Sequence, residues 1–190
     1  MKTATWSQGN LNYVCDYPPY WIYGESKTHN PHRTQDTYRV MDMKNPDSRN
    51  YQTSLRHFQG KLLGFFRRFP ELERYAAINL AIIPSSTAGK ESVPLRAIVQ
   101  HLNLNLPQTI RYNPQFLVRT YSVPSAHEGG QRNEQIHLDS IVVGTDIEPN
   151  VPLILLDDVY TTGSSMNACT RLLREAGVEH IYQLVLGKTV

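Results

Sequence analysis

Bulky apolar residues recur with a helical spacing in one long stretch of the chain. The steps between them are four, three, four, three and four, which is the stripe of an amphipathic helix. Ser48 or Asn50 is placed to cap this helix, and Pro70 follows its end. The stripe consists of Tyr51, Leu55, Phe58, Leu62, Phe65 and Phe69.

Apolar runs bounded by turn residues alternate with further helical patterns. The patterns predict helices over 91–101 and 166–176, the second ending at Gly177. Strands are expected at 76–83, 115–119, 136–143, 151–156 and 181–186. Strands that alternate with helices indicate an α/β fold with a mostly parallel central sheet flanked by helices. In such sheets, ligands bind beyond the carboxyl ends of the strands.

The first 47 residues differ in character, being polar with interspersed aromatic side chains. Proline-containing turns punctuate this stretch, and 25–37 is expected to be an exposed loop. Short strands are expected at 11–15 and 38–43. We therefore divide the chain into an aromatic, polar N-terminal extension, residues 1–47, which acts as a cover or a subunit contact, and a domain of residues 48–190.

Composition narrows the class of protein. The chain has 190 residues, with 19 Lys and Arg against 17 Asp and Glu, so its formal net charge is only +2. That balance gives no support for a nucleic-acid surface. No apolar run reaches the roughly 18 residues of a membrane span, and the N-terminus lacks an apolar signal core. Cys15 and Cys169 cannot build a four-thiolate zinc site or a disulfide framework, so we expect a cytoplasmic protein.

The segment 153–165 carries the strongest chemical pattern. An apolar strand runs into two acids, then into a loop with four hydroxyls and a glycine, then into a helix. The glycine lets backbone amides turn inward, and the helix adds its unpaired N–H groups and the positive end of its dipole. This assembly suits a phosphate monoester. The loop residues are Thr161, Thr162, Gly163, Ser164 and Ser165.

The acidic pair, Asp157 and Asp158, would repel a phosphate and suits vicinal hydroxyls, or a divalent cation reached through water. Neighbours on a regular strand face opposite sides, so both reach one ligand only if the strand has begun to turn. Together, the pair and the loop predict a phosphorylated sugar whose hydroxyls lie about the length of one ribose from its phosphate. The alternative is that the acids simply end a strand and the hydroxyls simply cap a helix.

A second strand end, at 82–90, offers hydroxyls, a flexible backbone and a lysine. It is not a P-loop, because Pro84 and Glu91 stand where that motif needs Gly and Ser or Thr. The segment could hold a pyrophosphate, or it could be an ordinary turn. The candidate residues are Ser85, Ser86, Thr87, Ala88, Gly89 and Lys90.

The segment 119–137 is a long polar stretch hinged by Gly129 and Gly130, a pattern typical of lids. Arg132 could close over a pyrophosphate as charge builds on it. His127 and Glu128 could move protons. The alternative is a solvated loop.

The segment 153–165 resembles the phosphoribosyl-pyrophosphate (PRPP) binding motif of type I phosphoribosyltransferases. The resemblance implies that Asp157 and Asp158 hold the ribose 2- and 3-hydroxyls and that residues 161–165 hold the 5-phosphate. It also places a pyrophosphate loop at 85–90 and a mobile catalytic loop at 119–137. From about residue 38 onward the chain is similar to the ComF-like, or predicted amidophosphoribosyltransferase, branch, including its ending at 184–189. ComF-type proteins carry an N-terminal four-cysteine zinc module, which this chain lacks, since only Cys15 lies there.

The resemblance implies a phosphoribosyltransferase that binds PRPP with Mg²⁺ and transfers the phosphoribosyl group to a small nitrogen nucleophile, releasing pyrophosphate. Mg²⁺ is expected on the pyrophosphate, with Asp157 or Asp158 reached through water and no direct protein ligand. The transition state is oxocarbenium-like, so positioning and electrostatics carry the catalysis. A homo-oligomer is expected. The alternative is a non-catalytic PRPP- or nucleotide-sensing module on the same fold, serving DNA uptake or genome defence.

Overall fold

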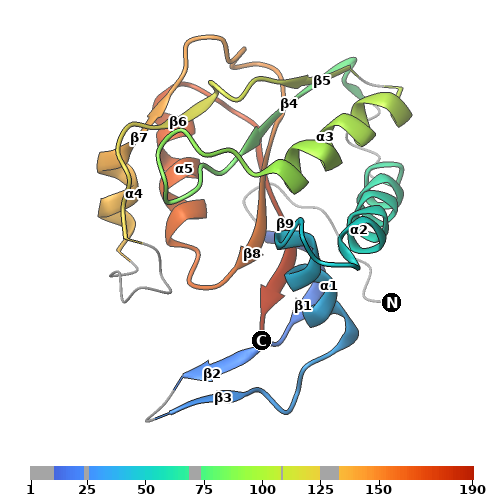
Figure 1. Ribbon diagram of the computed structural model, residues 1–190. Helices are drawn as coiled ribbons and strands as arrows, with labels where there is room; N and C mark the ends of the chain where they lie inside the picture. The colour runs from blue at the N-terminus through green and yellow to red at the C-terminus, as the bar shows by residue number, and fades with distance from the viewer. Residues whose placement is uncertain (1–10, 24–25, 69–73, 108, 125–132) are drawn as a thin grey trace.

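The centre of the molecule is a five-stranded sheet in which every neighbouring pair of strands is parallel, in the order β1-β9-β8-β4-β5. The computed structural model describes residues 11–23, 26–68, 74–107, 109–124 and 133–190. The predicted α/β fold with a mostly parallel sheet is confirmed (Figure 1). The strands are β1 (Leu11–Tyr17), β4 (Ala77–Ile82), β5 (Thr109–Tyr112), β8 (Leu153–Tyr160) and β9 (Ile181–Thr189).

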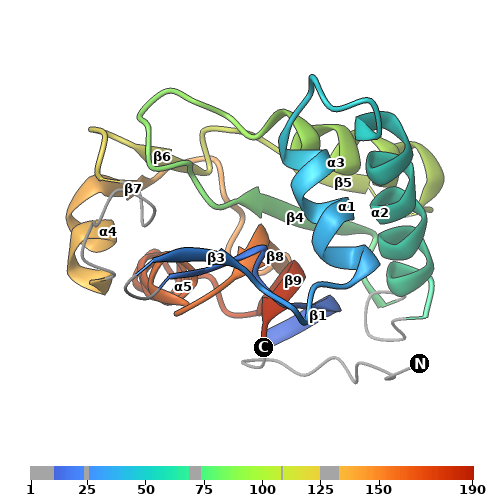
Figure 2. The ribbon, with the colours of Figure 1, turned by 60° about the horizontal axis from the view of Figure 1, so that its bottom comes forward.

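Helices cover both faces of this sheet (Figures 1 and 2). One face carries α1 (Gln35–Lys44), α2 (Tyr51–Phe66) and α3 (Val93–Asn105). The other carries α5 (Ser164–Glu175), with α4 (Glu134–Ser140) packed beside it, and a small antiparallel pair, β6 (Leu117–Arg119) and β7 (Ile141–Val143).

Alternating side chains of the central strands supply two separate apolar cores. On β8, Ile154 and Leu156 pack into the core beneath α1, α2 and α3, whereas Leu153 and Leu155 pack into the core beneath α5. All four side chains are fully buried. This two-sided burial explains why β8 is a continuous apolar run in the sequence instead of an alternating one.

The helix predicted from the apolar stripe is confirmed as α2. It begins at Tyr51, with Asn50 at the N-cap, and Tyr51, Leu55, Phe58 and Leu62 are buried as the spacing requires. Phe69 lies outside the described residues. The predicted helices at 91–101 and 166–176 are confirmed as α3 and α5, and the strands at 76–83, 115–119, 151–156 and 181–186 as β4, β6, β8 and β9, with ends shifted by a few residues.

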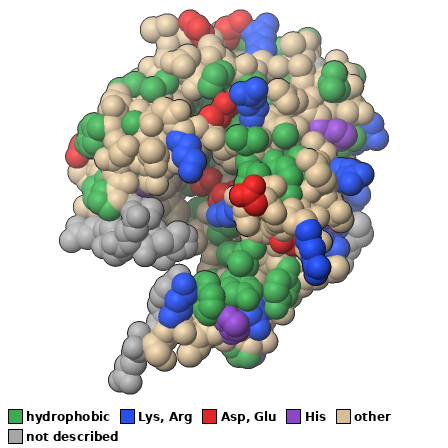
Figure 3. Space-filling view, in the orientation of Figure 1, with side chains coloured by type: hydrophobic (Ala, Val, Ile, Leu, Met, Phe, Trp, Pro, Cys, Tyr) green, Lys and Arg blue, Asp and Glu red, His purple; other side chains and the backbone are tan. Residues whose placement is uncertain are grey.

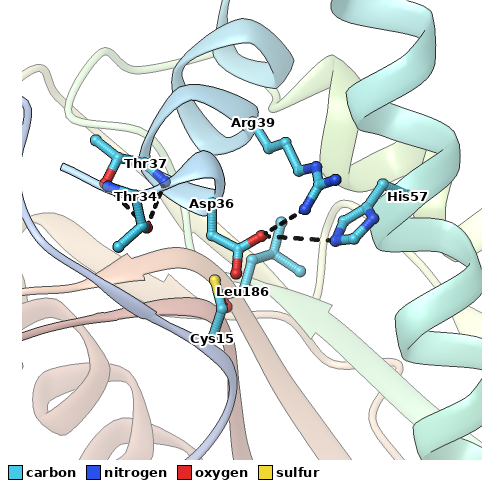
Figure 4. Close-up of polar contacts among 7 residues, drawn as sticks. All are labelled: Cys15, Thr34, Asp36, Thr37, Arg39, His57 and Leu186. Atoms are coloured by element: carbon cyan, nitrogen blue, oxygen red, sulfur yellow. Dashed lines mark hydrogen bonds and ion pairs between the residues drawn. The ribbon is translucent and has the colours of Figure 1, made fainter.

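The expected loop at 25–37 is wrong at Lys27–His29, which form a short strand, and at 35–37, and the expected strand at 38–43 is wrong, because α1 spans Gln35–Lys44. Thr34 caps this helix, because its hydroxyl accepts from the Thr37 amide while the Thr37 hydroxyl accepts from the Thr34 amide (Figure 4). Thr37, Val40 and Met43 are buried at steps of three residues. That helical spacing outweighed the strand propensity of the segment.

A second correction concerns the strand expected at 136–143. Residues up to Ser140 form α4, and only Ile141–Val143 form a strand. Asn133 explains the difference, since its side chain accepts from the Gln135 amide at 2.9 Å and starts the helix.

Polar contacts join α1 to α2. The Asp36 carboxylate lies 3.0 Å from Arg39 and 3.7 Å from the His57 ring (Figure 4). Burial, followed by Arg39, lowers the pKa of His57 despite the nearby Asp36. His57 is therefore mostly neutral near pH 7, so its 3.7 Å approach to Asp36 has little ion-pair character.

The N-terminal region contributes to the central sheet, because β1 pairs with β9 and forms its edge. The expected strand at 11–15 is confirmed and reaches Tyr17. A hairpin of β2 (Trp21–Tyr23) and β3 (Lys27–His29) follows and projects beyond the carboxyl edge of the sheet (Figure 1). The division of the chain at residue 47 stays a prediction. None of the helices in the described part of the chain has the length and apolar character needed to cross a membrane.

Candidate functional site

The two segments singled out in the sequence leave neighbouring strands at the same edge of the sheet. β4 and β8 are parallel partners, with Ile82 opposite Leu156, and the Ile83 amide donates to the Leu156 carbonyl at 2.9 Å. The candidate pyrophosphate loop, residues 85–90, therefore begins beside the acidic pair and the candidate phosphate loop, residues 161–165. In Figure 3 this face is hollowed above the β2–β3 hairpin, and acidic and basic side chains meet there.

The candidate phosphate loop turns directly into α5. Gly163 caps this helix in the left-handed conformation, with φ of 82°. A Cβ at this position would come within 2.2 Å of the Tyr160 hydroxyl, so only glycine fits under the Tyr160 ring. The Thr162 and Ser164 hydroxyls lie 3.1 Å apart. A cavity of about 40 Å³ opens over this loop.

The acidic pair lies inside β8 instead of after it, because the strand continues to Tyr160. Regular alternation is interrupted at the pair. Leu155 and Tyr160 pack against one core and Leu156 and Val159 against the other, and both separations are odd numbers of residues. The Asp158 amide also donates to its neighbour Asp157, at 2.8 Å. The strand therefore departs from a regular zigzag where the acids stand.

The two carboxyl groups of the acidic pair have different surroundings. Burial, followed by the adjacent Asp158 carboxylate, raises the pKa of Asp157 to about 8. Asp158 instead meets Lys44, the last residue of α1, whose Nζ lies 3.0 Å from Asp158 Oδ2. Burial alone would lower the pKa of Lys44, but Asp158 and then Asp157 raise it. The Lys44 ammonium thus offsets negative charge on both carboxyl groups.

Several amides of the candidate pyrophosphate loop are engaged within the protein. The Thr87 amide donates to Ser85 Oγ at 3.2 Å, and the Lys90 amide donates to the Thr87 carbonyl at 3.3 Å. The Ala88 amide donates to Ser122 Oγ at 3.0 Å. An anion at this loop would use its hydroxyls and the exposed Lys90 side chain, or would displace these bonds.

A larger cavity, of about 130 Å³, lies on the other side of that loop, toward β5 and β6. Its lining includes Lys90, Glu91, Tyr112 and Arg119. The Tyr112 hydroxyl donates to Glu91 in a short hydrogen bond, and burial, followed by that bond, raises the pKa of Tyr112. Tyr112 therefore stays protonated and Glu91 is held as its acceptor.

A hydrogen-bonded chain connects the two candidate loops. The buried Arg119 donates to the Ser85 and Pro84 carbonyls and contacts His137 Nδ1 at 3.2 Å. His137 Nε2 in turn lies 3.3 Å from Ser165 Oγ. Arg119 and His137 are the first and last residues of the segment in which the sequence predicted a lid. Arg132, His127 and Glu128 lie outside the described residues.

The described residues of this site offer a metal ion few direct ligands. Within the described ranges, no three His, Cys, Asp or Glu side chains come together that could hold one. Asp157 and Asp158, within β8, are hard oxygen donors, which suits contact with Mg²⁺ through water.

Comparisons with known proteins give distant structural likenesses and no sequence match. The chain matches no known family profile and no curated protein. Among solved structures it is similar to an adenine phosphoribosyltransferase from Leishmania donovani, with TM-score 0.46 and 10% identity, over 97% of this chain and 86% of that one. It is also similar to a hypoxanthine phosphoribosyltransferase from Staphylococcus aureus, with TM-score 0.40 and 10% identity, over 80% and 74% of the two chains.

A purine phosphoribosyltransferase from Pyrococcus horikoshii is similar with TM-score 0.36 and 12% identity, over 70% of this chain and 87% of that one. At such low identity no residue role passes from these proteins to this chain. The function proposed below therefore rests on this chain's own residues and their geometry.

Proposed function

We propose that this protein binds PRPP with Mg²⁺ and transfers its phosphoribosyl group to a nitrogen nucleophile with release of pyrophosphate. The observation that carries the proposal is the continuity of β8, the acidic pair and the glycine-capped start of α5. Gly163 keeps the backbone close at the helix N-terminus. Four hydroxyls surround it within residues 161–165. That combination suits a phosphate monoester attached to a sugar.

Each group would have a separate task. Residues 161–165 would hold the 5-phosphate through hydroxyls and amides. Asp157 and Asp158 would accept hydrogen bonds from the ribose 2- and 3-hydroxyls. Lys90 and Arg132 would face the departing pyrophosphate and offset its growing negative charge. When bound through PRPP, Mg²⁺ would supply further charge neutralisation at the pyrophosphate.

The protonation of Asp157 matters to this assignment. A carboxyl with a pKa of about 8 is mostly protonated at neutral pH, whereas a ribose hydroxyl is best held by a carboxylate. Lys44 lowers the pKa of Asp157 through its charge, so it favours the carboxylate form. We infer that Lys44 supports the ribose clamp, and that Mg²⁺ brought in with PRPP would favour ionisation of the pair further.

Calorimetry with PRPP and Mg²⁺ tests the binding step. Wild-type protein should bind, and replacing Asp157 and Asp158 together by Ala should abolish detectable binding while leaving the circular dichroism spectrum unchanged. The matched control is Asp139→Ala, which removes an exposed carboxylate from α4 and should bind like wild type. Equal affinity of the double variant and wild type would overturn the ribose clamp.

A non-catalytic PRPP- or nucleotide-sensing module is the second candidate. The engaged amides of Thr87, Ala88 and Lys90 favour it, because a pyrophosphate leaving group then has a less complete cradle. Pyrophosphate release from PRPP, measured across a panel of purine, pyrimidine and amine acceptors, separates the two. Release with one acceptor supports a transferase, whereas PRPP binding without release supports a sensor.

The finer assignment to a ComF-like, or predicted amidophosphoribosyltransferase, branch belongs to the same proposal. Its supporting observation is the order of elements from α1 to β9 and the ending at 184–189. A transferase of that kind would use ammonia or glutamine-derived nitrogen as the acceptor. Ammonia-dependent release of pyrophosphate from PRPP would support this branch, and its absence in the presence of a productive base would exclude it.

A further inference from the structure

We propose that Arg119 and His137 are positioning residues that fix the Ser165 hydroxyl as a hydrogen-bond donor to the phosphoryl group of the ligand. The inference rests on the proposed function, because it concerns the phosphate loop at the start of α5. It adds two residues, from β6 and α4, whose effect on the ligand passes through Ser165. The juxtaposition of these three side chains carries the argument.

Arg119 determines the direction of the chain because a guanidinium has only donors. Its side chain is 4% exposed, and its N–H groups point at the Ser85 and Pro84 carbonyls, Ser140 Oγ and His137 Nδ1. Ser140 Oγ must accept from Arg119, and its own proton goes to the Ile136 carbonyl at 2.6 Å. The same reasoning makes His137 Nδ1 an acceptor, which leaves the ring proton on Nε2.

The neutral ring is the form that fits. Burial, followed by the Arg119 charge, lowers the pKa of His137, and a second ring proton on Nδ1 would face the guanidinium N–H directly. With Nδ1 accepting, the Nε2–H donates to Ser165 Oγ, 3.3 Å away. Arg119 thus selects one tautomer, and that tautomer fills one lone pair of the serine.

Ser165 is then left with a directed proton. It is the last residue of the candidate phosphate loop and the second residue of α5, and it is half-buried. The structure records no other hydrogen bond of this hydroxyl to a described residue. A hydroxyl that accepts from an imidazole N–H is polarised and donates more strongly. A phosphoryl oxygen seated at the start of α5 is the acceptor that this geometry favours.

Arg119 also reaches the other candidate loop, because it donates to the carbonyls of Ser85, the first residue of that loop, and of Pro84, just before it. One buried cation therefore holds the backbone of the candidate pyrophosphate loop and, through His137, the side chain that faces the phosphate. This makes Arg119 itself a poor experimental target, because its removal would leave a buried set of acceptors unpaired. His137 and Ser165 are the better pair to change.

The experiment is a double-mutant cycle read by calorimetry with ribose 5-phosphate as the probe. His137→Leu and Ser165→Ala should each weaken binding about fivefold, the effect of one lost hydrogen bond. In the Ser165→Ala background, His137→Leu should produce no further loss. His137→Gln, whose amide offers an acceptor oxygen and a donor NH₂ group, should recover most of the wild-type affinity. Asp139→Asn, an exposed change on the same helix, is the control and should bind like wild type.

A second readout needs no ligand. Nitrogen-15 NMR of the histidine rings at pH 7 should show His137 neutral, with Nε2 protonated and Nδ1 bare. The inference would be overturned by a His137 ring that is protonated on Nδ1 or charged. It would also be overturned if the affinity losses of His137→Leu and Ser165→Ala added in the double variant. Either result would leave PRPP binding in place. If the wild-type protein binds neither ribose 5-phosphate nor PRPP, the proposed function and this inference both fall, whatever the tautomer.

Discussion

Lys44 Nζ lies 3.0 Å from Asp158 Oδ2, so the last residue of α1 meets the end of β8 at the candidate ribose clamp. The contact explains how β8 can carry two adjacent carboxyl groups near its carboxyl end. Asp158 is neutralised by the ammonium, and Asp157 by its own raised pKa. Both devices reduce the repulsion that two carboxylates would exert on each other and on a phosphorylated ligand.

Replacing Lys44 by Gln should weaken PRPP binding, because it removes the positive charge that both carboxyl groups share. The free energy of unfolding should fall by less than about 1 kcal/mol, since the pair is partly exposed. Calorimetry and urea denaturation measure the two effects. Arg49→Gln, an exposed change of the same charge just before α2, is the control. An equal loss of affinity in both variants would mean that only net charge matters.

Replacing Asp157 by Asn should stabilise the fold at pH 8 by about 1 kcal/mol or more, the scale of a poorly matched buried polar group. The folded pKa of Asp157 is raised from 3.8 to about 8, so the wild-type protein loses stability as the pH rises through that window. The Asn variant should lack this loss and should bind PRPP more weakly. Urea denaturation between pH 5 and 8 would show the difference. A variant less stable than wild type at pH 8 would contradict it.

Replacing Gly163 by Ala should abolish binding of ribose 5-phosphate and lower stability by about 1–2 kcal/mol, the cost of left-handed backbone for an L-residue. The new Cβ would also collide with the Tyr160 ring. Gly177→Ala, at the other end of α5, is the matched control, because it has φ of 89° and open space around it. That variant should lose stability alone. If both variants bound ribose 5-phosphate equally, residues 161–165 would not hold the phosphate.

The His137→Gln variant should change the acid side of the stability profile. Because burial lowers the pKa of His137 from 6.5, the unfolded chain takes up a proton before the folded protein does, and stability falls as the pH drops below about 6.5. Gln cannot titrate, so part of this fall should disappear between pH 6.5 and 5. Thermal melts across that range measure it. His57, whose pKa is also lowered, keeps its own share in both proteins.

Local patterns in the sequence were enough to predict most of the sheet and the candidate loops. The stripe from Tyr51 to Leu62 and the apolar run before Asp157 each carry their signal within one element, and the structure has α2 and β8 there. The mostly parallel sheet was also predicted, but the pairing of β4 with β8, which brings the two candidate loops to one edge, joins distant segments and was not. The roles assigned to the loop residues stay predictions.

Contacts between distant residues could not be predicted in this way. Arg119 and Ser165 lie 18 and 28 residues from His137, so nothing near His137 in the sequence marks it as a link between loops. The helix α1 differs for a local reason: its capping box pairs Thr34 with Thr37, where the usual pattern has Glu or Gln, so no familiar start signal precedes it.

The central claim is that residues 161–165 hold a phosphate monoester, and amide NMR on addition of ribose 5-phosphate tests it most directly. The account predicts that the backbone N–H signals of Thr161 to Ser165 shift together and saturably, while the signal of Gly177 at the far end of α5 stays in place. Saturable binding that shifts signals elsewhere and leaves these five unchanged would contradict it.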